Sequence, residues 1–475
     1  MLRVLLVTAA VMVLVVTGEN EAPVICSMCM CLDLQPYDVD CTTTDMRKIP
    51  DMSRDNFTIP WELDFSNNLI QEVTQFPLLP NMVNLIFRRN NINKLSDEAF
   101  KNLPDLKILI LQKNNLTVNS LNENVFRGKY NDSFLEPLAL EELDLSYNQI
   151  SSFKSHTLKH LPYLKRLFLS HNPITDISWA MGAAINELHN LRELDLSQTG
   201  LNRLPNHFLT DLRNLQVLTL AENRFTTVPS EINYARNLVH LNLNANPIVS
   251  IMTGDFQAGL STLQELQMCA MPDLRNVGAQ AFSSLSSLKV LQLSDNPLLS
   301  VIDRKAFYPV MDDKLALQEI HIQNNNLMAL PEDLVPWLRL KYVDIQNNPW
   351  NCDCHFKWVA TKLIPDLEAK NPDRTLSIIC AEPIEDRGMP VSDLLNHSIN
   401  FECMAPHPFV NNEGRYGALI VSTIVVGVIL MLTGTLIFSY VLFRRTRNGQ
   451  MFGDTIKYRR AHNEDEEATS QTVHS

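Results

Sequence analysis

The sequence lacks the short motifs that carry most enzyme chemistry. It contains no Gly-x-x-x-x-Gly-Lys, Gly-x-Gly-x-x-Gly, His-Glu-x-x-His or Gly-x-Ser-x-Gly element. In enzymes these elements hold phosphate groups, a catalytic zinc ion or an activated serine. The 12 histidines are scattered along the chain. We therefore predict a protein that is not an enzyme and that uses no metal ion or cofactor.

Positive charge is in short supply. The chain has 40 lysines and arginines against 53 acidic residues, which gives a formal net charge of −13. Nucleic acids, heparin-like chains and anionic lipid headgroups select basic proteins. The charge balance argues against all three as the main partner, and we expect no nucleic acid partner.

Long uncharged apolar runs occur only near the two ends. Residues 1–18 place Arg3 before an apolar stretch and small residues, the pattern of a secretory signal with cleavage near Gly18. Residues 417–443 carry no charge, and a helix of this length, about 40 Å, spans a bilayer. Arginines from Arg444 onward mark the cytoplasmic side. We expect a single-pass type I protein of the plasma membrane.

Cysteine is rare between the ends. Eight of the nine cysteines form two groups, and only Cys269 lies far from both. In a secreted chain such groups form disulfides. A zinc site would fit the spacing of the first group, but it does not fit an oxidising compartment. The groups are Cys26, Cys29, Cys31 and Cys41, and Cys352, Cys354, Cys380 and Cys403.

The chain is rich in one repeated pattern, Leu-x-x-Leu-x-Leu-x-x-Asn-x-Leu, which occurs twelve times. LEELDLSYNQI (140–150) and LKVLQLSDNPL (288–298) show it most clearly. The spacing of about 24 residues is typical of leucine-rich repeats. Thr199 and Met271 replace the asparagine in two copies. The asparagines are Asn68, Asn90, Asn114, Asn148, Asn172, Asn223, Asn246, Asn296, Asn325 and Asn348.

The pattern predicts a solenoid. Leucines two residues apart lie on one face of a short strand, and stacked strands bury these leucines together in a continuous core. The asparagine side chain can bond backbone groups where the chain leaves the strand. The exposed ends of such a core need caps, and the two cysteine groups lie where caps are expected. We predict an α/β solenoid, a horseshoe with a parallel sheet on its concave face and a disulfide-bonded cap at each end.

Four features of the sequence together resemble the extracellular leucine-rich-repeat transmembrane proteins, particularly neuronal and insect cell-surface members. They are the cysteine groups, the repeats, the NPWNCDC element (348–354) and the apolar run 417–443. The resemblance covers about residues 24 to 443. It implies the disulfides Cys26–Cys31, Cys29–Cys41, Cys352–Cys380 and Cys354–Cys403. Without the resemblance, three connectivities remain open in each cap.

The expected organisation follows from these segments. It comprises a signal peptide (1–18), an N-terminal cysteine cap (19–58), about twelve repeats (59–350), a C-terminal cysteine cap (351–404), a juxtamembrane linker (405–416), a transmembrane helix (417–443) and a short disordered cytoplasmic tail (444–475).

A ligand is expected on the strand face that points away from the core. Most residues between the paired leucines are polar, but Ile86, Ile110 and Phe168 are apolar, and Ile108, Arg88 and Arg166 are their neighbours on the same face. An apolar patch edged by arginine is typical of a protein-binding surface. The alternative is that branched and aromatic residues are there because they favour strands.

Four Asn-x-Ser/Thr sequons lie away from these positions, at Asn56, Asn115, Asn131 and Asn396. Glycans there would leave the concave face open. The insertion at 117–139 is interpreted as a glycan-covered surface loop, with a projecting ligand loop as the alternative.

These features predict a cell-surface recognition or adhesion receptor for an extracellular or cell-surface protein, or for a second copy of itself. The resemblance suggests neuronal cell–cell contact or synapse assembly. One alternative is a co-receptor for a secreted ligand or microbial product in immunity. Another is a membrane trafficking adaptor that acts through its tail, in which Tyr458 is a candidate phosphorylation site. The tail is too short for a kinase or a Toll/interleukin-1 receptor domain.

Cys269 lies in the ninth repeat, where Met271 stands at the asparagine position. No basic or histidine neighbour in the local sequence favours a thiolate. We expect a local distortion to tuck Cys269 under the next turn, since free cysteine is usually buried. A disulfide to a second chain is the alternative.

Overall fold

The structure, a computed structural model, divides the chain into two units, Met1–Cys403 and Met404–Ser475. The expected signal segment, most of the expected span 417–443 and the tail after Arg444 lie outside the residues that it describes. None of the described helices has both the length and the apolar character that crossing a membrane requires. The described residues are 23–32, 36–131, 134–309, 315–370, 372–394, 433–437 and 439–444.

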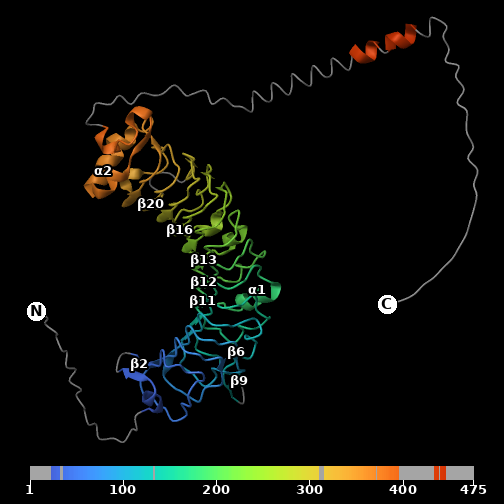
Figure 1. Ribbon diagram of the computed structural model, residues 1–475, viewed down its shortest axis with the longest axis vertical. Coiled ribbons are helices and arrows are strands. Elements are labelled where there is room, and N and C mark those ends of the chain that lie inside the picture. Colours follow the sequence, from blue (N-terminus) through green and yellow to red (C-terminus); the bar gives the residue numbers. More distant parts are fainter. Residues whose placement is uncertain are drawn as a thin grey trace, which may run out of the picture. The chain divides into compact units, whose positions relative to one another are not determined.

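The first unit is a curved stack whose inner side is lined by one long sheet (Figure 1). This sheet has 14 strands, and all neighbours are parallel except the first pair. In order, its strands are β1 (Met30–Leu32), β2 (Tyr37–Asp40), β3 (Trp61–Asp64), β5 (Met82–Ile86), β7 (Ile108–Ile110), β10 (Glu142–Asp144), β11 (Arg166–Phe168), β12 (Glu193–Asp195), β13 (Val217–Thr219), β14 (His240–Asn242), β16 (Glu265–Gln267), β18 (Val290–Gln292), β20 (Glu319–His321) and β21 (Tyr342–Asp344).

Smaller elements complete the outer side and the caps. Three two-stranded pairings and one three-stranded sheet are formed by β4 (Glu72–Val73), β6 (Lys94–Leu95), β8 (Tyr130–Asn131), β9 (Phe134–Leu135), β15 (Ser250–Ile251), β17 (Asn276–Val277), β19 (Val301–Ile302), β22 (Trp350–Asn351) and β23 (Cys380–Glu382). The helices are α1 (Trp179–Asn186) and α2 (Ile364–Lys370), with short 3₁₀ or π turns at η1 (Val24–Ser27), η2 (Ser230–Tyr234), η3 (Ala258–Leu260), η5 (Trp337–Arg339), η6 (Val359–Leu363), η7 (Pro372–Ser377), η8 (Ile384–Asp386) and η9 (Val391–Asp393).

The repeated leucines produce the sheet as predicted. Leu143 of β10 pairs with Leu109 on one side and Leu167 on the other, and all three side chains are fully buried. Behind them, phenylalanines of the inter-strand runs stack along the core, as Phe100 does on Phe126 with 6.1 Å between ring centroids. The predicted parallel sheet on the concave face of a solenoid is confirmed.

The asparagines bond backbone groups where the chain leaves the strand, as predicted, and the structure shows that they also link successive repeats. Asn246 donates from Nδ2 to the carbonyls of Leu220 and Leu243, each at 2.9 Å, and its Oδ1 accepts from the backbone N–H of Phe225 at 3.2 Å. We call the row of such asparagines the asparagine ladder. The residue before each ladder position, such as Tyr147 or His171, has a positive φ near 55°. This left-handed turn directs the chain from the strand to the outer side.

Disulfides close both caps. The structure forms Cys26–Cys31, Cys29–Cys41 and Cys352–Cys380, the pairs that the resemblance implied. Cys354 is disulfide-bonded as well, and its expected partner Cys403 lies outside the described residues. The fully buried Trp350 lies against Phe356 of the C-terminal cap, with 5.2 Å between their ring centroids.

The expected surface loop at 117–139 is only partly a loop. Leu121, Val125 and Phe126 are fully buried, because this stretch supplies the core residues of an ordinary inter-strand run. The addition to the repeat is the antiparallel pair β8–β9. Gly128 precedes it, and a Cβ there would lie 1.9 Å from the carbonyl oxygen of Glu136, so the close approach of the two chains requires glycine.

Candidate ligand-binding face

The concave face is built from two side chains per strand. In each parallel strand the central leucine, isoleucine or valine points into the core, and the residues before and after it point outward. We call the residues before it row one and those after it row two. Row one is Asp38, Glu62, Asn84, Ile108, Glu142, Arg166, Glu193, Val217, His240, Glu265, Val290, Glu319 and Tyr342. Row two is Asp40, Asp64, Ile86, Ile110, Asp144, Phe168, Asp195, Thr219, Asn242, Gln267, Gln292, His321 and Asp344.

Three of the expected ligand residues lie together. Ile86 of β5 is opposite Ile110 of β7, and Ile108 is opposite Asn84. Ile86 and Ile108 are half-buried, whereas Ile110 is only 8% exposed. The apolar surface that a ligand could contact here is therefore supplied mainly by Ile86 and Ile108, with the exposed Arg88 at the end of β5.

Phe168 and Arg166 form a separate group. Strand β10 lies between β7 and β11, so Asp144 separates Ile110 from Phe168, and Glu142 separates Ile108 from Arg166. The six residues therefore do not make one continuous apolar patch. The reason is the one-strand-per-repeat geometry, which places a complete polar strand between the two groups.

Arg166 and Phe168 are surrounded by carboxylates. Arg166 donates from Nε to Glu142 Oε2 at 2.6 Å. On the other side, β12 places Glu193 opposite Arg166 and Asp195 opposite Phe168. Burial raises the pKa of Glu193, and the nearby charges of Glu142 and Asp195 raise it further, while Arg166 opposes them. Among the described residues, no hydrogen bond or ion pair to the Glu193 carboxylate is found.

Asp144 and Asp195 also hold the ends of their own strands. The carboxylate of Asp144 accepts from the backbone N–H of Ser146 at 2.8 Å and from its hydroxyl at 2.5 Å. Asp195 does the same with Ser197, at 2.9 and 2.6 Å. Burial raises the pKa of Asp144, and the bonds from Ser146 oppose that effect. Each aspartate thus has a local structural role beside any role in binding.

A hollow of about 610 Å³ lies beside the first group, at the edge where the strands begin. Ile59, Pro60, Val83 and Ile108 contribute apolar wall, and Lys107, Glu141 and Arg166 contribute charge. Ile59 is 45% exposed. Sequence reasoning missed Ile59 and Pro60, which lie directly before β3, and Val83, which lies in β5 but outside the outward positions from which ligand residues were predicted. The Ile-Pro pair directly before β3 was the available signal.

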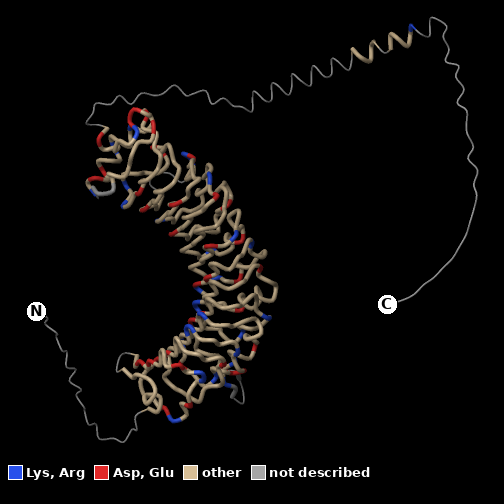
Figure 2. The backbone as a smooth tube through the Cα atoms, viewed as in Figure 1, with Lys and Arg blue, Asp and Glu red and all other residues tan. Residues whose placement is uncertain are grey.

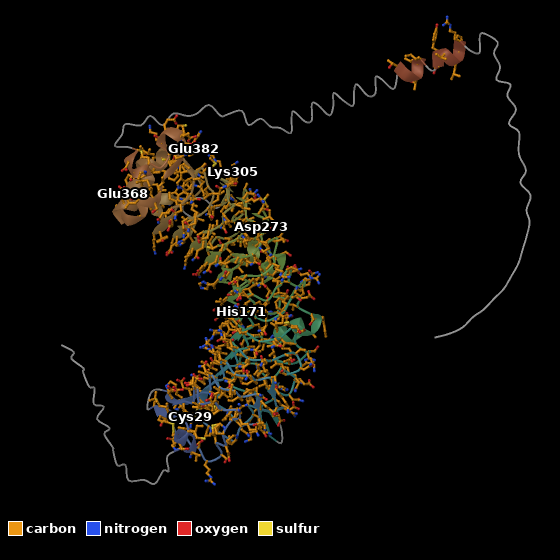
Figure 3. The ribbon with its side chains drawn as sticks, in the orientation of Figure 1. Cys29, His171, Asp273, Lys305, Glu368 and Glu382 are labelled. Carbon is orange, nitrogen blue, oxygen red and sulfur yellow. A yellow bond between two sulfur atoms is a disulfide. The ribbon has the colours of Figure 1, made fainter. Side chains whose placement is uncertain are left out.

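An aromatic pair lies at the opposite edge, where the strands end. Tyr147 stacks on His171 with 3.6 Å between ring centroids, and Lys113 Nζ lies 4.7 Å from the centroid of the Tyr147 ring. All three residues precede a ladder asparagine and have a positive φ. His171 is labelled on the inner side of the curve (Figure 3). None of the three stands at the outward strand positions from which the ligand residues were predicted, so this row was not expected.

Cys269 lies in the row that follows row two. It is half-buried, its backbone N–H donates to Asn244 Oδ1 at 2.7 Å, and the Ser294 hydroxyl donates to its Sγ at 3.2 Å. Burial raises the pKa of the thiol. Met271 is fully buried and packs in the core in place of a ladder asparagine. The thiol lies beside the next strand, and a disulfide to a second chain stays a prediction.

The sequons do not occupy the two rows. Asn56 and Asn115 are exposed, Asn131 ends β8, and Asn396 lies outside the described residues. Glycosylation at all four stays a prediction, as does phosphorylation of Tyr458, which also lies outside the described residues.

Comparison with known proteins was made for both sequence and structure. Residues 148–369 match the family model "Leucine-rich repeat region", and residues 72–181 match "BspA type Leucine rich repeat region (6 copies)". Tsukushi of Gallus gallus is 29% identical over 232 residues, which cover 44% of this chain and 61% of Tsukushi. Transforming growth factor beta activator LRRC33 of Danio rerio is 25% identical over 369 residues, which cover 63% of this chain and 50% of that protein.

The chain thus spans between half and about three fifths of the length of these relatives. Among solved structures, the Toll–Spatzle complex of Drosophila is similar with a TM-score of 0.47 and 20% identity, covering 73% of this chain and 56% of that one. The two family matches together run from residue 72 to 369, within the stack of repeats that the structure shows. Residues 72–369 are thus a leucine-rich-repeat region.

Proposed function

We propose that this protein is an extracellular recognition receptor that binds a protein ligand through its concave face, as cell-surface adhesion and recognition proteins do. The observation that carries the proposal is the apolar surface of Ile86 and Ile108, on the neighbouring strands β5 and β7, together with the hollow beside Ile108. They bring exposed apolar surface together on a face that is otherwise polar. Protein interfaces are typically centred on such apolar anchors with polar residues around them.

Several features support a place outside the cell. The described cysteines of both caps are in disulfides, which persist in oxidising compartments. The residue pattern at 1–18 fits a signal peptide, and the uncharged run 417–443 fits a membrane anchor. With the anchor in the plasma membrane, the concave face is available to a protein on another cell or in the extracellular space. Neuronal contact is the setting that the sequence resemblance favours.

A second candidate is a co-receptor for a secreted ligand. The name of one relative, a transforming growth factor beta activator, favours it. Both candidates use the same face and differ in whether the partner is anchored or soluble. The adaptor alternative depends on the tail, which lies outside the described residues.

The test uses cells that express the full chain and a panel of purified extracellular proteins and partner-cell surfaces. We expect the double change Ile86→Asn and Ile108→Asn to abolish binding to a partner found in this way, with unchanged surface expression. These changes are uncharged and create no sequon. The matched control is Val249→Asn with Val301→Asn, which alters two exposed apolar residues outside the two rows and creates no sequon. Equal binding by both double variants would refute the concave patch as the site.

A further inference from the structure

The two outward rows of the concave sheet are strongly acidic. Across the thirteen parallel strands β2 to β21 they contain eleven carboxylates and one guanidinium, an excess of ten negative charges. The whole chain has a formal net charge of −13. Most of the net charge of the protein is therefore concentrated on one face. Acidic residues recur along the inner edge of the first unit, most densely at β2 and β3 (Figure 2).

Few ion pairs neutralise this charge within the described part of the protein, although burial raises the pKa of Asp144 and the nearby charge of Arg88 opposes that effect. Of the ion pairs found there that involve the two rows, one uses a guanidinium, between Arg166 and Glu142. The other two use histidines, His240 with Glu265 and His321 with Glu319. Asp38 shows the consequence, because burial and the charges of Glu62, Asp40 and Asp64 all raise its pKa. The face carries mutual repulsion that a cationic partner would relieve.

The spacing suits cationic side chains better than a metal ion. Among the described residues, no group of three acidic, histidine or cysteine side chains is close enough to hold a metal ion. Adjacent strands lie about 4.8 Å apart, so Asp144 and Asp195 flank Phe168 at a separation of about 10 Å. A lysine or arginine that packs on the ring face of Phe168 would lie about 5 Å from each of the two flanking strands, within reach of the field of both carboxylates. Cations bind aromatic faces within about 6 Å of the ring centroid.

We propose that the ligand presents a basic segment, with several lysines or arginines, that lies along rows one and two, and that one of these side chains packs on Phe168 between Asp144 and Asp195. This proposal rests on the proposed function and specifies the chemistry of its partner. The apolar group at Ile86 and Ile108 would provide contact area, and the acidic rows would provide orientation and rapid association.

The test measures peptide binding to the full chain, immobilised through a C-terminal tag after expression in a secretory system. The probes are an alternating lysine–serine peptide and a glutamate–serine peptide of equal length. We expect only the lysine peptide to bind, and its affinity to fall by about tenfold or more between about 50 mM and about 500 mM salt, because salt screens exposed charges. No binding of the lysine peptide, or equal binding of both peptides, would refute the proposal.

Variants locate the binding on the sheet. The triple change Glu62→Gln, Glu142→Gln and Glu193→Gln removes three charges of row one. Glutamates are chosen because asparagine at 144 or 195 would create an Asn-Leu-Ser sequon. We expect this variant to bind the lysine peptide about fivefold or more weakly, and Phe168→Leu to weaken it by about threefold.

The control triple removes the same charge outside the two rows. It is Glu231→Gln, Glu368→Gln and Glu385→Gln; Glu368 is labelled on the C-terminal cap (Figure 3). We expect less than about a twofold change in peptide affinity. Equal losses in both triples would mean that the peptide reports overall charge, which would refute the inference. If Ile86→Asn with Ile108→Asn abolishes partner binding but the row-one triple leaves peptide and partner binding unchanged, the proposed function stands and the basic partner does not.

Discussion

The asparagine ladder leads to a quantitative prediction about stability, and Asn246 is its clearest test. The side chain is fully buried and makes two hydrogen bonds of 2.9 Å to backbone carbonyls and one of 3.2 Å from the N–H of Phe225. The change Asn246→Ala leaves these three backbone groups buried without their partner. Each such group costs about 1–3 kcal/mol, and partial relaxation reduces the sum. We expect the free energy of unfolding to fall by about 3–5 kcal/mol.

The assay is denaturant unfolding of the full chain, followed by circular dichroism and by tryptophan fluorescence. The two probes report whether the stack still unfolds as one unit, which repeat proteins do not always do. Asn202→Ala is the matched control, because Asn202 is an exposed asparagine outside the ladder. Its effect should stay within about 0.5 kcal/mol. If Asn246→Ala costs no more than Asn202→Ala, the ladder does not stabilise the stack as argued.

Three further predictions concern single residues. Burial raises the pKa of Glu193, so its ionised form is disfavoured in the folded state. The change Glu193→Gln should therefore stabilise the protein at neutral pH. This gain in the free energy of unfolding should shrink as pH falls through the raised pKa toward the usual value of about 4.3. Unfolding curves of Glu193→Gln from about pH 7 to about pH 3 test this expectation, with Glu368→Gln as the control. A stabilisation by Glu193→Gln that grew on acidification would contradict it. Gly259→Ala should destabilise the protein by about 3 kcal/mol, because the new Cβ would lie 2.1 Å from the carbonyl oxygen of Asn233. Gly182→Ala, whose Cβ would lie 3.8 Å from Phe208, should instead stabilise helix α1 by about 0.5–1 kcal/mol. Thermal melting curves of both variants test these opposite expectations. Cys269 should resist alkylation by iodoacetamide in the native protein and react after denaturation, as read by mass spectrometry, and rapid native labelling would contradict the burial-raised pKa of its thiol.

The fold was predictable because its information is local and repeated. Leu143 and Leu145 are two residues apart, so they lie on one face of a strand wherever that strand goes, and twelve copies specify the stack. Asn148 stands at a fixed distance after them, and the structure places it in the ladder. The disulfide pairs were different, since the resemblance and not the spacing selected Cys26–Cys31 from the possible pairs.

The candidate site was predictable only in part. The outward position of Ile86 and Phe168 followed from strand alternation, but the degree of exposure did not: Ile110 is almost covered. The hollow beside Ile108 requires Ile59 and Pro60 to approach it from outside the repeated pattern, and no local rule gives that approach. The acidic character of the face could be predicted from the sequence strand by strand. Which of its carboxylates form ion pairs could not, because that depends on which cationic side chains the fold brings near them.

The replacement of the ladder asparagine by Met271 has a mechanical consequence. In a stack where each repeat touches only its neighbours, the repeats behave as springs in series, and the most compliant junction takes up most of the deformation. Asn246 links its repeat to the one before through two side-chain bonds, but the thioether of Met271 can make no equivalent link to the repeat of Asn246. The hydroxyl of Thr199, the other replacement, bonds Leu196 of its own repeat and Asn223 of the next one, so these bonds do not link it to the repeat before. We expect a tensile load applied to the two caps to open the stack first at one of the two junctions where the ladder asparagine is replaced, before Thr199 or before Met271.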